Sequence, residues 1–293
     1  MIRTVIFSCL LFIIALSLPA QRDGNLTLKE GQVIQLQEEM TSNSFQTAGA
    51  QVINFKLNAI LVHRYTVTGV TSINTITFRH EIPQLQFSFE GMGQKRNFDS
   101  RNEEDMKGPF GPYFAKISSL SCSVIVDSSG KKITPISFDL PYPLPKPDEK
   151  VVIIADMLKP LLQQSIYCGL TPGFLTGSSH GVSNLGSTWK EVIENENESL
   201  TTTYTLSSLT DSTWLVNLVA TGTNNYVSEM MGRITKTKLN NECTGKIIFD
   251  RSSGLVSEKE ITTNSKGTTG AMGGTVPVNG KCTIVTKVNL LKQ

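Results

Sequence analysis

The stretch QVINFKLNAILVHRYTVTGV, residues 51–70, decides the fold class because its apolar and polar side chains alternate. Ile53 and Phe55 fall on one side of an extended chain, whereas Asn54 and Lys56 fall on the other. A period of two over this length is typical of a β-strand with one buried face and one hydrated face. Antiparallel sheets commonly have one packed and one solvated face, so this stretch predicts an antiparallel sheet.

The neighbouring segments extend this interpretation. Residues 74–91 repeat the alternation, and Pro83 predicts a bend or an edge position because proline cannot donate to a strand ladder. Residues 97–114 are charged and then rich in Gly and Pro, which predicts a loop with a short helix. Residues 121–140 predict a hairpin, with Asp127 and Gly130 at its turn. Further strands are predicted in 201–209, 212–222, 243–263 and 282–290, and a mobile Gly/Thr-rich loop in 263–281.

The centre of the sequence differs from both flanks. Alternating prolines from Pro141 to Pro147 predict an extended connector. The segment that follows, as far as Gly169, predicts a helix that Asp148 caps and that Pro160 kinks or restarts. Its apolar stripe predicts packing against the sheet rather than on a membrane surface, and consists of Val151, Ile154, Leu158, Leu161 and Leu162.

These patterns predict a mainly β protein: an antiparallel curved sheet or half-barrel, as one unit or as two β-rich halves, with a central helical segment. An echo between VIVDSSGKKI (124–133) and IIFDRSSGLV (247–256) is compatible with a duplication, or with two turns that use the same chemistry independently. The predicted divisions are a signal peptide (1–20), a first β-rich half (21–140), a Pro-rich connector and helix (141–170) and a second β-rich half (171–293).

The first residues have the pattern of a secretory signal peptide. Arg3 is the one charge, an apolar run of about 14 residues follows, and Ala20 is a small residue at its end. A spanning helix needs roughly 20 apolar residues, so the run predicts cleavage after Ala20 rather than anchoring. Cys9 lies inside the apolar run, which disfavours lipidation. We therefore expect an exported protein, periplasmic or extracellular, with no membrane span after cleavage.

Cysteine usage fits an oxidising compartment. Loss of Cys9 with the signal leaves an even set, which predicts disulfides. The preferred pairing joins sequence neighbours, Cys122 with Cys168 and Cys243 with Cys282, although other pairings or buried free thiols stay open. A metal site is not expected, because the cysteines do not form close Cys/His pairs.

Several function classes are disfavoured. Without Arg3 the chain has 26 basic side chains (27 − 1) against 25 acidic ones, and it has no basic stripe, so nucleic acid is not an expected partner. Gly177–Gly181 fits the G-x-S-x-G pattern around Ser179, but no histidine follows His180, as a serine hydrolase would require. His63 and His80 are interpreted as surface or core residues, not ligands. We predict no catalytic residues and no cofactor.

Five short landmarks are spread over the mature chain: EGQVIQLQEEM (30–40), NFDSRNEED (97–105), VIVDSSGKKI (124–133), LGSTWK (185–190) and IIFDRSSGLVSEKEI (247–261). Together they resemble an uncharacterised family of exported bacterial envelope proteins, a domain of unknown function. The resemblance implies export and an extended antiparallel sheet, and it brings no catalytic residues. A looser similarity, of shape, is to periplasmic lipoprotein-carrier half-barrels, in which a curved sheet and a helix enclose an apolar cavity.

Three functions are compared. The first is a non-enzymatic binding module of the envelope, which holds an apolar or amphipathic ligand on the concave sheet face with the helix as a lid. The second is a structural or interaction protein that meets an envelope partner and has no small ligand. The third, most remote, is a serine hydrolase. The sequence favours the first, with the ligand-binding residues unassigned.

Overall fold

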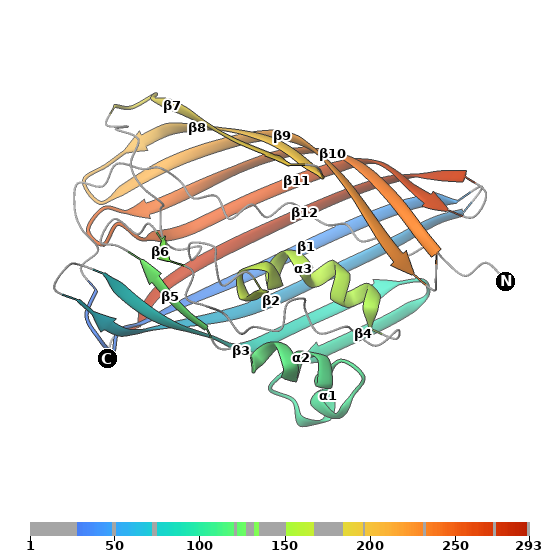
Figure 1. The fold of residues 1–293 in the computed structure, drawn as a ribbon, viewed down its shortest axis with the longest axis horizontal. Helices are drawn as coiled ribbons and strands as arrows, with labels where there is room; N and C mark the ends of the chain where they lie inside the picture. The colour runs from blue at the N-terminus through green and yellow to red at the C-terminus, as the bar shows by residue number, and fades with distance from the viewer. Residues whose placement is uncertain are drawn as a thin grey trace.

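The computed structural model of this protein describes residues 28–48, 51–71, 75–119, 122–126, 132–134, 151–166, 184–195, 197–230, 233–271 and 274–291. They form one curved antiparallel sheet with short helices on one of its faces, which confirms the predicted fold class (Figure 1). Within these ranges, no helix is both long and apolar enough to cross a membrane.

Twelve strands of the described residues make up the sheet. The first half contributes β1 (Val33–Ala48), β2 (Gln51–Val70), β3 (Ile76–Gly91), β4 (Gln94–Asp99), β5 (Cys122–Val126) and β6 (Lys132–Thr134). The second half contributes β7 (Thr188–Asn195), β8 (Glu198–Leu209), β9 (Thr213–Met230), β10 (Arg233–Asp250), β11 (Val256–Ala271) and β12 (Gly274–Leu291). The helices are α1 (Glu103–Lys107), α2 (Gly111–Ser118) and α3 (Val152–Ile166).

The strand order is β6-β5-β3-β2-β1-β12-β11-β10-β9-β8-β7, and β4 pairs with β3 beside β5. Most neighbours in the sheet are also neighbours in the sequence, as expected of antiparallel hairpins. Two pairings are exceptions: β3 also pairs with β5, and β1 pairs with β12 as well as with β2. The second of these is the long-range one. This pairing joins the two β-rich halves in one sheet.

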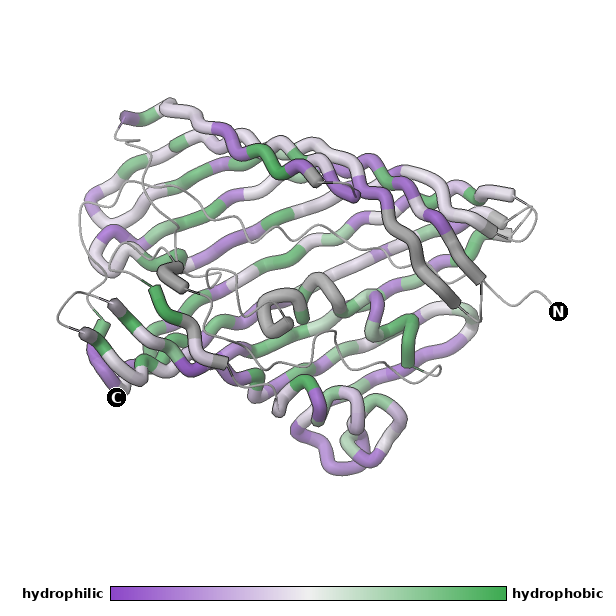
Figure 2. The backbone as a smooth tube through the Cα atoms, in the orientation of Figure 1, coloured by the Kyte–Doolittle hydropathy of each residue, from purple (hydrophilic) through white to green (hydrophobic). Residues whose placement is uncertain are grey.

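The two faces of the sheet differ as the alternation predicts. On β2, Phe55, Leu57 and Leu61 are buried on the face that carries α3, here called the helix-bearing face, whereas Lys56 is exposed on the other. The opposite face carries cross-strand ion pairs, such as Lys246 Nζ with Glu260 Oε2 at 3.2 Å. Figure 2 shows the resulting alternation of hydrophobic and hydrophilic residues along the strands.

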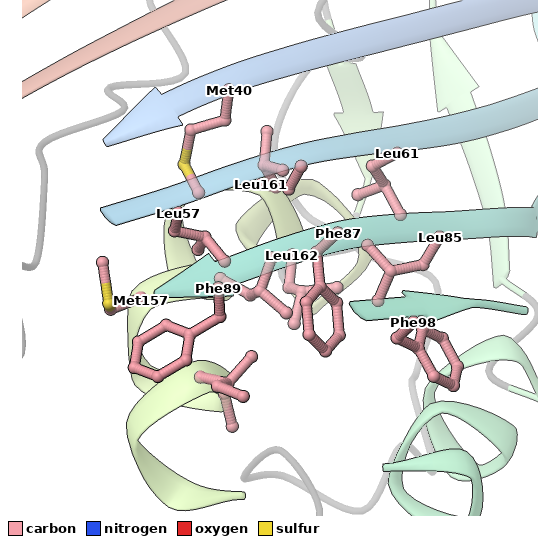
Figure 3. Close-up of a cluster of buried hydrophobic side chains, with 14 of the residues drawn as sticks. Met40, Leu57, Leu61, Leu85, Phe87, Phe89, Phe98, Met157, Leu161 and Leu162 are labelled. Carbon is pink, nitrogen blue, oxygen red and sulfur yellow. The ribbon is translucent and has the colours of Figure 1, made fainter. Parts of the chain in front are cut away.

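Helix α3 covers the part of the helix-bearing face formed by β1, β2 and β3 (Figure 1). Its predicted apolar stripe is confirmed as core, because all five of its residues are buried. Leu161 and Leu162 lie in one cluster with Leu57 and Leu61 of β2 and with Phe87 and Phe89 of β3 (Figure 3). Burying such a leucine contributes about 1.5–3 kcal/mol. The helix continues through position 160, so the proline there does not restart it.

Pro83 occupies a special place on β3, as its sequence context predicts. The outer edge of β3 pairs with β5 at residues 76–80 and with β4 at residues 86–91. Pro83 lies between these two pairings, where no described strand would accept a hydrogen bond from the N–H that proline lacks. On the other side of β3, the pairing with β2 shifts register at this position.

Residues 263–281 are predicted as a mobile loop, but the described ones, 263–271 and 274–281, form the end of β11 and the start of β12. Thr263–Ala271 pairs with Gly274–Cys282 in register. The prediction is wrong because glycine has a packing role here. A Cβ added at Gly267 would lie 1.9 Å from the backbone oxygen of Lys238, so only glycine allows β10 and β11 to approach this closely.

The turn between β10 and β11 has the chemistry expected of the Asp-x-Ser-Ser-Gly pattern. Asp250 Oδ1 accepts hydrogen bonds from the backbone N–H of Ser253 and from the hydroxyls of Ser252 and Ser253. These bonds lower the pKa of Asp250 below its usual value. Gly254 has a φ of 65°, the left-handed region that glycine adopts without steric cost. The corresponding turn at Asp127 and Gly130 lies outside the described residues.

Candidate functional site

A row of side chains crosses the helix-bearing face at right angles to the strands. Register places Glu38 of β1 opposite Thr286 of β12, and Thr286 opposite Lys259 of β11. All three side chains are buried. Apolar residues continue the row on both sides: Leu61 and Leu85 beyond Glu38, and Ile247, Val216 and Leu206 beyond Lys259. Polar and ionisable groups therefore lie in the middle of an otherwise apolar row.

Two histidines extend the polar part toward β3. His63 Nε2 lies 3.3 Å from Glu38 Oε2, and His63 Nδ1 lies 2.9 Å from His80 Nε2. Thr286 Oγ1 donates to the other carboxylate oxygen of Glu38 at 3.3 Å. The Tyr65 ring stacks on His80 with 4.5 Å between ring centroids. We call Glu38, His63, Tyr65, His80, Lys259 and Thr286 the polar row.

The hydrogen-bond inventory gives the direction of one of these contacts. The carboxylate of Glu38 only accepts, so His63 donates to it from Nε2. Between His63 Nδ1 and His80 Nε2 the tautomers decide which nitrogen donates. The two imidazoles and the carboxylate thus form one chain of hydrogen bonds. Both ring nitrogens of His63 are engaged in this chain.

Burial controls protonation in the polar row. Removal from water holds the pKa of His80 well below its usual value, and neighbouring His63 adds to this effect. Burial, together with the Glu38 charge, raises the pKa of Tyr65. Burial lowers the pKa of Lys259, although the charge of Glu38 acts in the opposite direction.

Lys259 differs from the rest of the polar row in its contacts. Its side chain is 93% buried (7% exposed). Its ammonium group makes no hydrogen bond, and no ion pair within 4 Å, with the described part of the chain. Glu38 acts on it through its charge, while the carboxylate oxygens of Glu38 accept from His63 and Thr286. Burial disfavours the charged form of an amine, which is the cause of the lowered pKa of Lys259.

Beyond Lys259 lies a second cluster, here called the aromatic face. Trp189 of β7 stacks on Tyr204 of β8 with ring centroids 5.1 Å apart. The Tyr204 hydroxyl donates to Glu191 Oε2 at 3.0 Å. The buried members all lie on strands: Trp189, Tyr204, Leu206, Val216, Leu218, Ile247, Phe249 and Val256, with Trp214, Ile261 and Val288 at its margin.

The aromatic face has two polar atoms without a hydrogen-bond partner. The indole Nε1 atoms of Trp189 and Trp214 are both buried, and neither one has an acceptor among the residues that the structure describes. Buried indole N–H groups usually find an acceptor. These are the only two tryptophans in the sequence. The face therefore combines a large apolar area with two donors that an acceptor could satisfy.

The two halves of the helix-bearing face are filled differently. The part formed by β1–β3 packs against α1, α2 and α3, and aromatic contacts such as Phe98 with Phe110 complete that core. The aromatic face contains no residue of the described helices, and its eight buried members are at most 8% exposed. Protein side chains already pack beneath α3, so that part of the face is not the predicted ligand surface. The aromatic face and Lys259 make up the candidate site.

The predicted cysteine pairing is wrong for one of its two pairs. Cys243 of β10 and Cys282 of β12 both lie opposite Thr263 of β11, so a strand separates them. Two strand spacings are roughly 10 Å, which exceeds the Cα separation that a disulfide allows. Cys243 is a free thiol whose Sγ lies 3.3 Å from Thr263 Oγ1. The pairing of Cys122 with Cys168 cannot be placed, because Cys168 lies outside the described residues.

Sequence reasoning missed both parts of the candidate site. It treated His63 and His80 as separate, although the pairing of β2 with β3 brings them within hydrogen-bond distance. It left Lys259 and the two tryptophans without a role. Ser179 and His180 lie outside the described residues. Across the described ranges, no group of three or more His, Cys, Asp or Glu side chains is arranged to hold a metal ion.

No family model and no curated protein matches this sequence. Among solved structures, an outer membrane channel from Pseudomonas putida F1 is 7% identical, with 92% of this chain and 100% of that chain covered and a TM-score of 0.24. OpdQ from Pseudomonas aeruginosa is 8% identical over 90% of this chain and 100% of that chain, with a TM-score of 0.25. OmpF from Salmonella typhi, in complex with daunomycin, is 8% identical over 88% of this chain and 98% of that chain, with a TM-score of 0.25. None of these three is described as a lipoprotein carrier, and a likeness this weak assigns neither family nor function to the chain.

Proposed function

We propose that this protein is an exported, non-enzymatic binding module that holds an apolar or amphipathic ligand on the aromatic face. The two buried indole N–H groups without acceptors carry the proposal. Ligand sites are mostly apolar and aromatic, with a few polar groups that fix orientation, and the aromatic face has this composition. Export follows from the signal-peptide pattern of residues 1–20.

The chemistry of the opposite face favours a ligand site on the helix-bearing face instead. Lys246 pairs with Glu258 and Glu260 there, and Lys287 pairs with Glu39. Such cross-strand ion pairs suit a face in water. An apolar ligand would gain nothing from that surface, whereas the aromatic face offers aliphatic and aromatic contacts.

Tryptophan fluorescence tests the proposal, because both tryptophans belong to the candidate site. Delipidated protein is titrated with palmitate, hexadecanol and hexadecane. We expect a saturable change in emission with at least one of them. Leu218→Gln places an amide on the aromatic face, whereas Val219→Gln changes the next residue, which is exposed on the opposite face.

Binding should weaken in Leu218→Gln and persist in Val219→Gln, with circular dichroism confirming that both variants fold. If no probe changes the emission of the folded wild type, the aromatic face is an ordinary core and the proposal fails. Equal weakening in both variants would also contradict it, because Val219 lies on the other side of the sheet.

A second candidate function, an interaction protein of the envelope, is favoured by β7. This strand ends the strand order, and Val192 and Ile193 on it are exposed. A strand edge can pair with a strand of another chain. Pull-down from intact envelopes tests this function. A specific partner that is lost on Val192→Lys would support it, whereas a protein that stays monomeric and partnerless would exclude it.

A further inference from the structure

Strand β7 ends the strand order, so only one of its two edges pairs with a described strand (Figure 1). Just before β7 begins, the N–H of Leu206 on β8 donates to the carbonyl of Ser187 at 3.0 Å. In an antiparallel pair, residues that exchange hydrogen bonds alternate with residues that do not. Continued along β7, this alternation turns the backbone groups of Glu191 and Ile193 toward β8 and those of Val192 toward the outer edge. The outer edge therefore offers backbone donors and acceptors to another strand.

The side chains at this edge are exposed. Lys190, Val192 and Glu194 are spaced two apart, so they project together from the face opposite the helices. All three are exposed, and Val192 is 64% exposed. Ile193, on the helix-bearing face, is 36% exposed. A strand that arrives at β7 would thus meet side chains that lie in water, and not side chains that are packed in the core.

The charges on β7 make pairing depend on register. Charged residues on an edge strand usually discourage pairing with another chain. When a second copy pairs antiparallel with Val192 opposite Val192, however, Lys190 of each copy lies opposite Glu194 of the other. Opposite charges at paired positions stabilise a ladder, whereas like charges destabilise it. In this register, two ion pairs flank an apolar contact.

The neighbouring registers lack this match. If both copies keep their helix-bearing faces on the same side of the joined sheet, a two-fold axis perpendicular to it passes through a residue of β7. An axis at Lys190 places two ammonium groups opposite each other, and an axis at Glu191 does the same with two carboxylates. An axis at Ile193 places Glu194 opposite Val192. Only the axis at Val192 gives each Lys190 an opposite charge on the same face.

Resting on the second candidate function above, an interaction protein, we propose that its partner is a second copy of this chain, joined through β7 with Val192 on the two-fold axis. The backbone groups of Lys190, Val192 and Glu194 would exchange hydrogen bonds across the axis, which is how a strand adds to a free sheet edge. Such a contact uses the same surface in both copies and therefore closes as a dimer. It does not depend on ligand binding.

Charge reversal and rescue test the pairing. Sedimentation equilibrium at low ionic strength measures the dissociation constant of the dimer. Lys190→Glu places like charges opposite each other in both pairs, so the constant should rise roughly 10- to 100-fold. Glu194→Lys should act in the same direction. The two substitutions in one chain exchange the charges and should restore the dimer. Lys281→Glu, which changes an exposed lysine of the same face on β12, is the matched control and should have no effect.

Disulfide cross-linking tests the register. Residues that exchange hydrogen bonds across an antiparallel pair have Cα atoms about 5.5 Å apart, a separation that a disulfide allows. Mild oxidation of Val192→Cys should therefore give a peptide that is joined to its own copy through position 192. Lys190→Cys should give no such peptide, because in this register position 190 lies opposite Glu194.

Each outcome has one meaning. Rescue by the double substitution, together with the cross-link at position 192, supports the dimer. A wild type that stays monomeric at its solubility limit refutes it. If that monomer still captures an envelope partner that Val192→Lys loses, the second candidate function stands, whereas capture of none refutes both. A dimer that Lys190→Glu leaves intact uses another surface and refutes the inference.

Discussion

Nδ1 of His63 lies 2.9 Å from Nε2 of His80, and both imidazoles are buried between the sheet and its covering residues. The contact joins β2 to β3 and continues to the carboxylate of Glu38 on β1. Three strands thus share one chain of hydrogen bonds. This relationship makes stability depend on pH in a defined direction.

The pKa of His80 is held well below its usual 6.5 by burial and by His63, so the unfolded chain binds a proton there more readily than the folded protein. Stability is therefore full above pH 6.5 and falls as the pH drops below it, by up to about 1.4 kcal/mol per unit until the folded pKa is reached. Urea unfolding between pH 7.5 and 5.5 measures this slope.

His80→Gln provides the control, because its amide can still donate to His63 Nδ1 but does not titrate. The variant should lose most of the slope, even if its stability at pH 7.5 is lower. An equal slope in wild type and His80→Gln would show that the histidine pair does not set the pH dependence.

Gly267 should be intolerant of a side chain. A Cβ there would lie 1.9 Å from the backbone oxygen of Lys238, and backbone cannot move aside as a flexible side chain can. Gly267→Ala should lower the free energy of unfolding by about 1–3 kcal/mol, the usual range for overpacking. Gly69→Ala is the matched control, since no atom lies within 4 Å of its added Cβ. Loss of stability in Gly69→Ala alone would contradict the strand packing described for β10 and β11.

Cys243 should remain a thiol that reagents do not reach in the folded protein. It is buried, and burial raises the pKa of its thiol, so little of the reactive thiolate forms near neutral pH. Iodoacetamide should label Cys243 after denaturation without reductant, but not before. A cross-linked peptide containing both Cys243 and Cys282 would contradict the strand order, because β11 separates them.

The sheet and its packed face could be predicted from the sequence because they depend on local alternation. Phe55 and Leu57 reveal their shared face through spacing alone, and the stripe of α3 does the same at helical spacing. Gly267 misled the prediction because glycine marks loops more often than closely paired strands. The composition around Gly267 does not show which strand will lie against the backbone of that glycine.

The candidate site could not be predicted because it depends on long-range register. Glu38 and Thr286 are 248 residues apart and meet only because β1 pairs with β12. A shift of one residue in that pairing would turn Thr286 to the other face. Lys259 likewise borders the aromatic face only through its register with Ile247. Neither relationship can be recognised from a short stretch of the sequence.

Native mass spectrometry of the protein purified from the cells that make it tests the central claim most directly. We expect a mature chain that begins near Gln21 and retains one apolar or amphipathic ligand. The Leu218→Gln variant, purified in the same way, should lose that adduct. A folded wild-type protein that carries no adduct, and that takes up none when palmitate is added, would contradict the claim that the aromatic face binds a ligand.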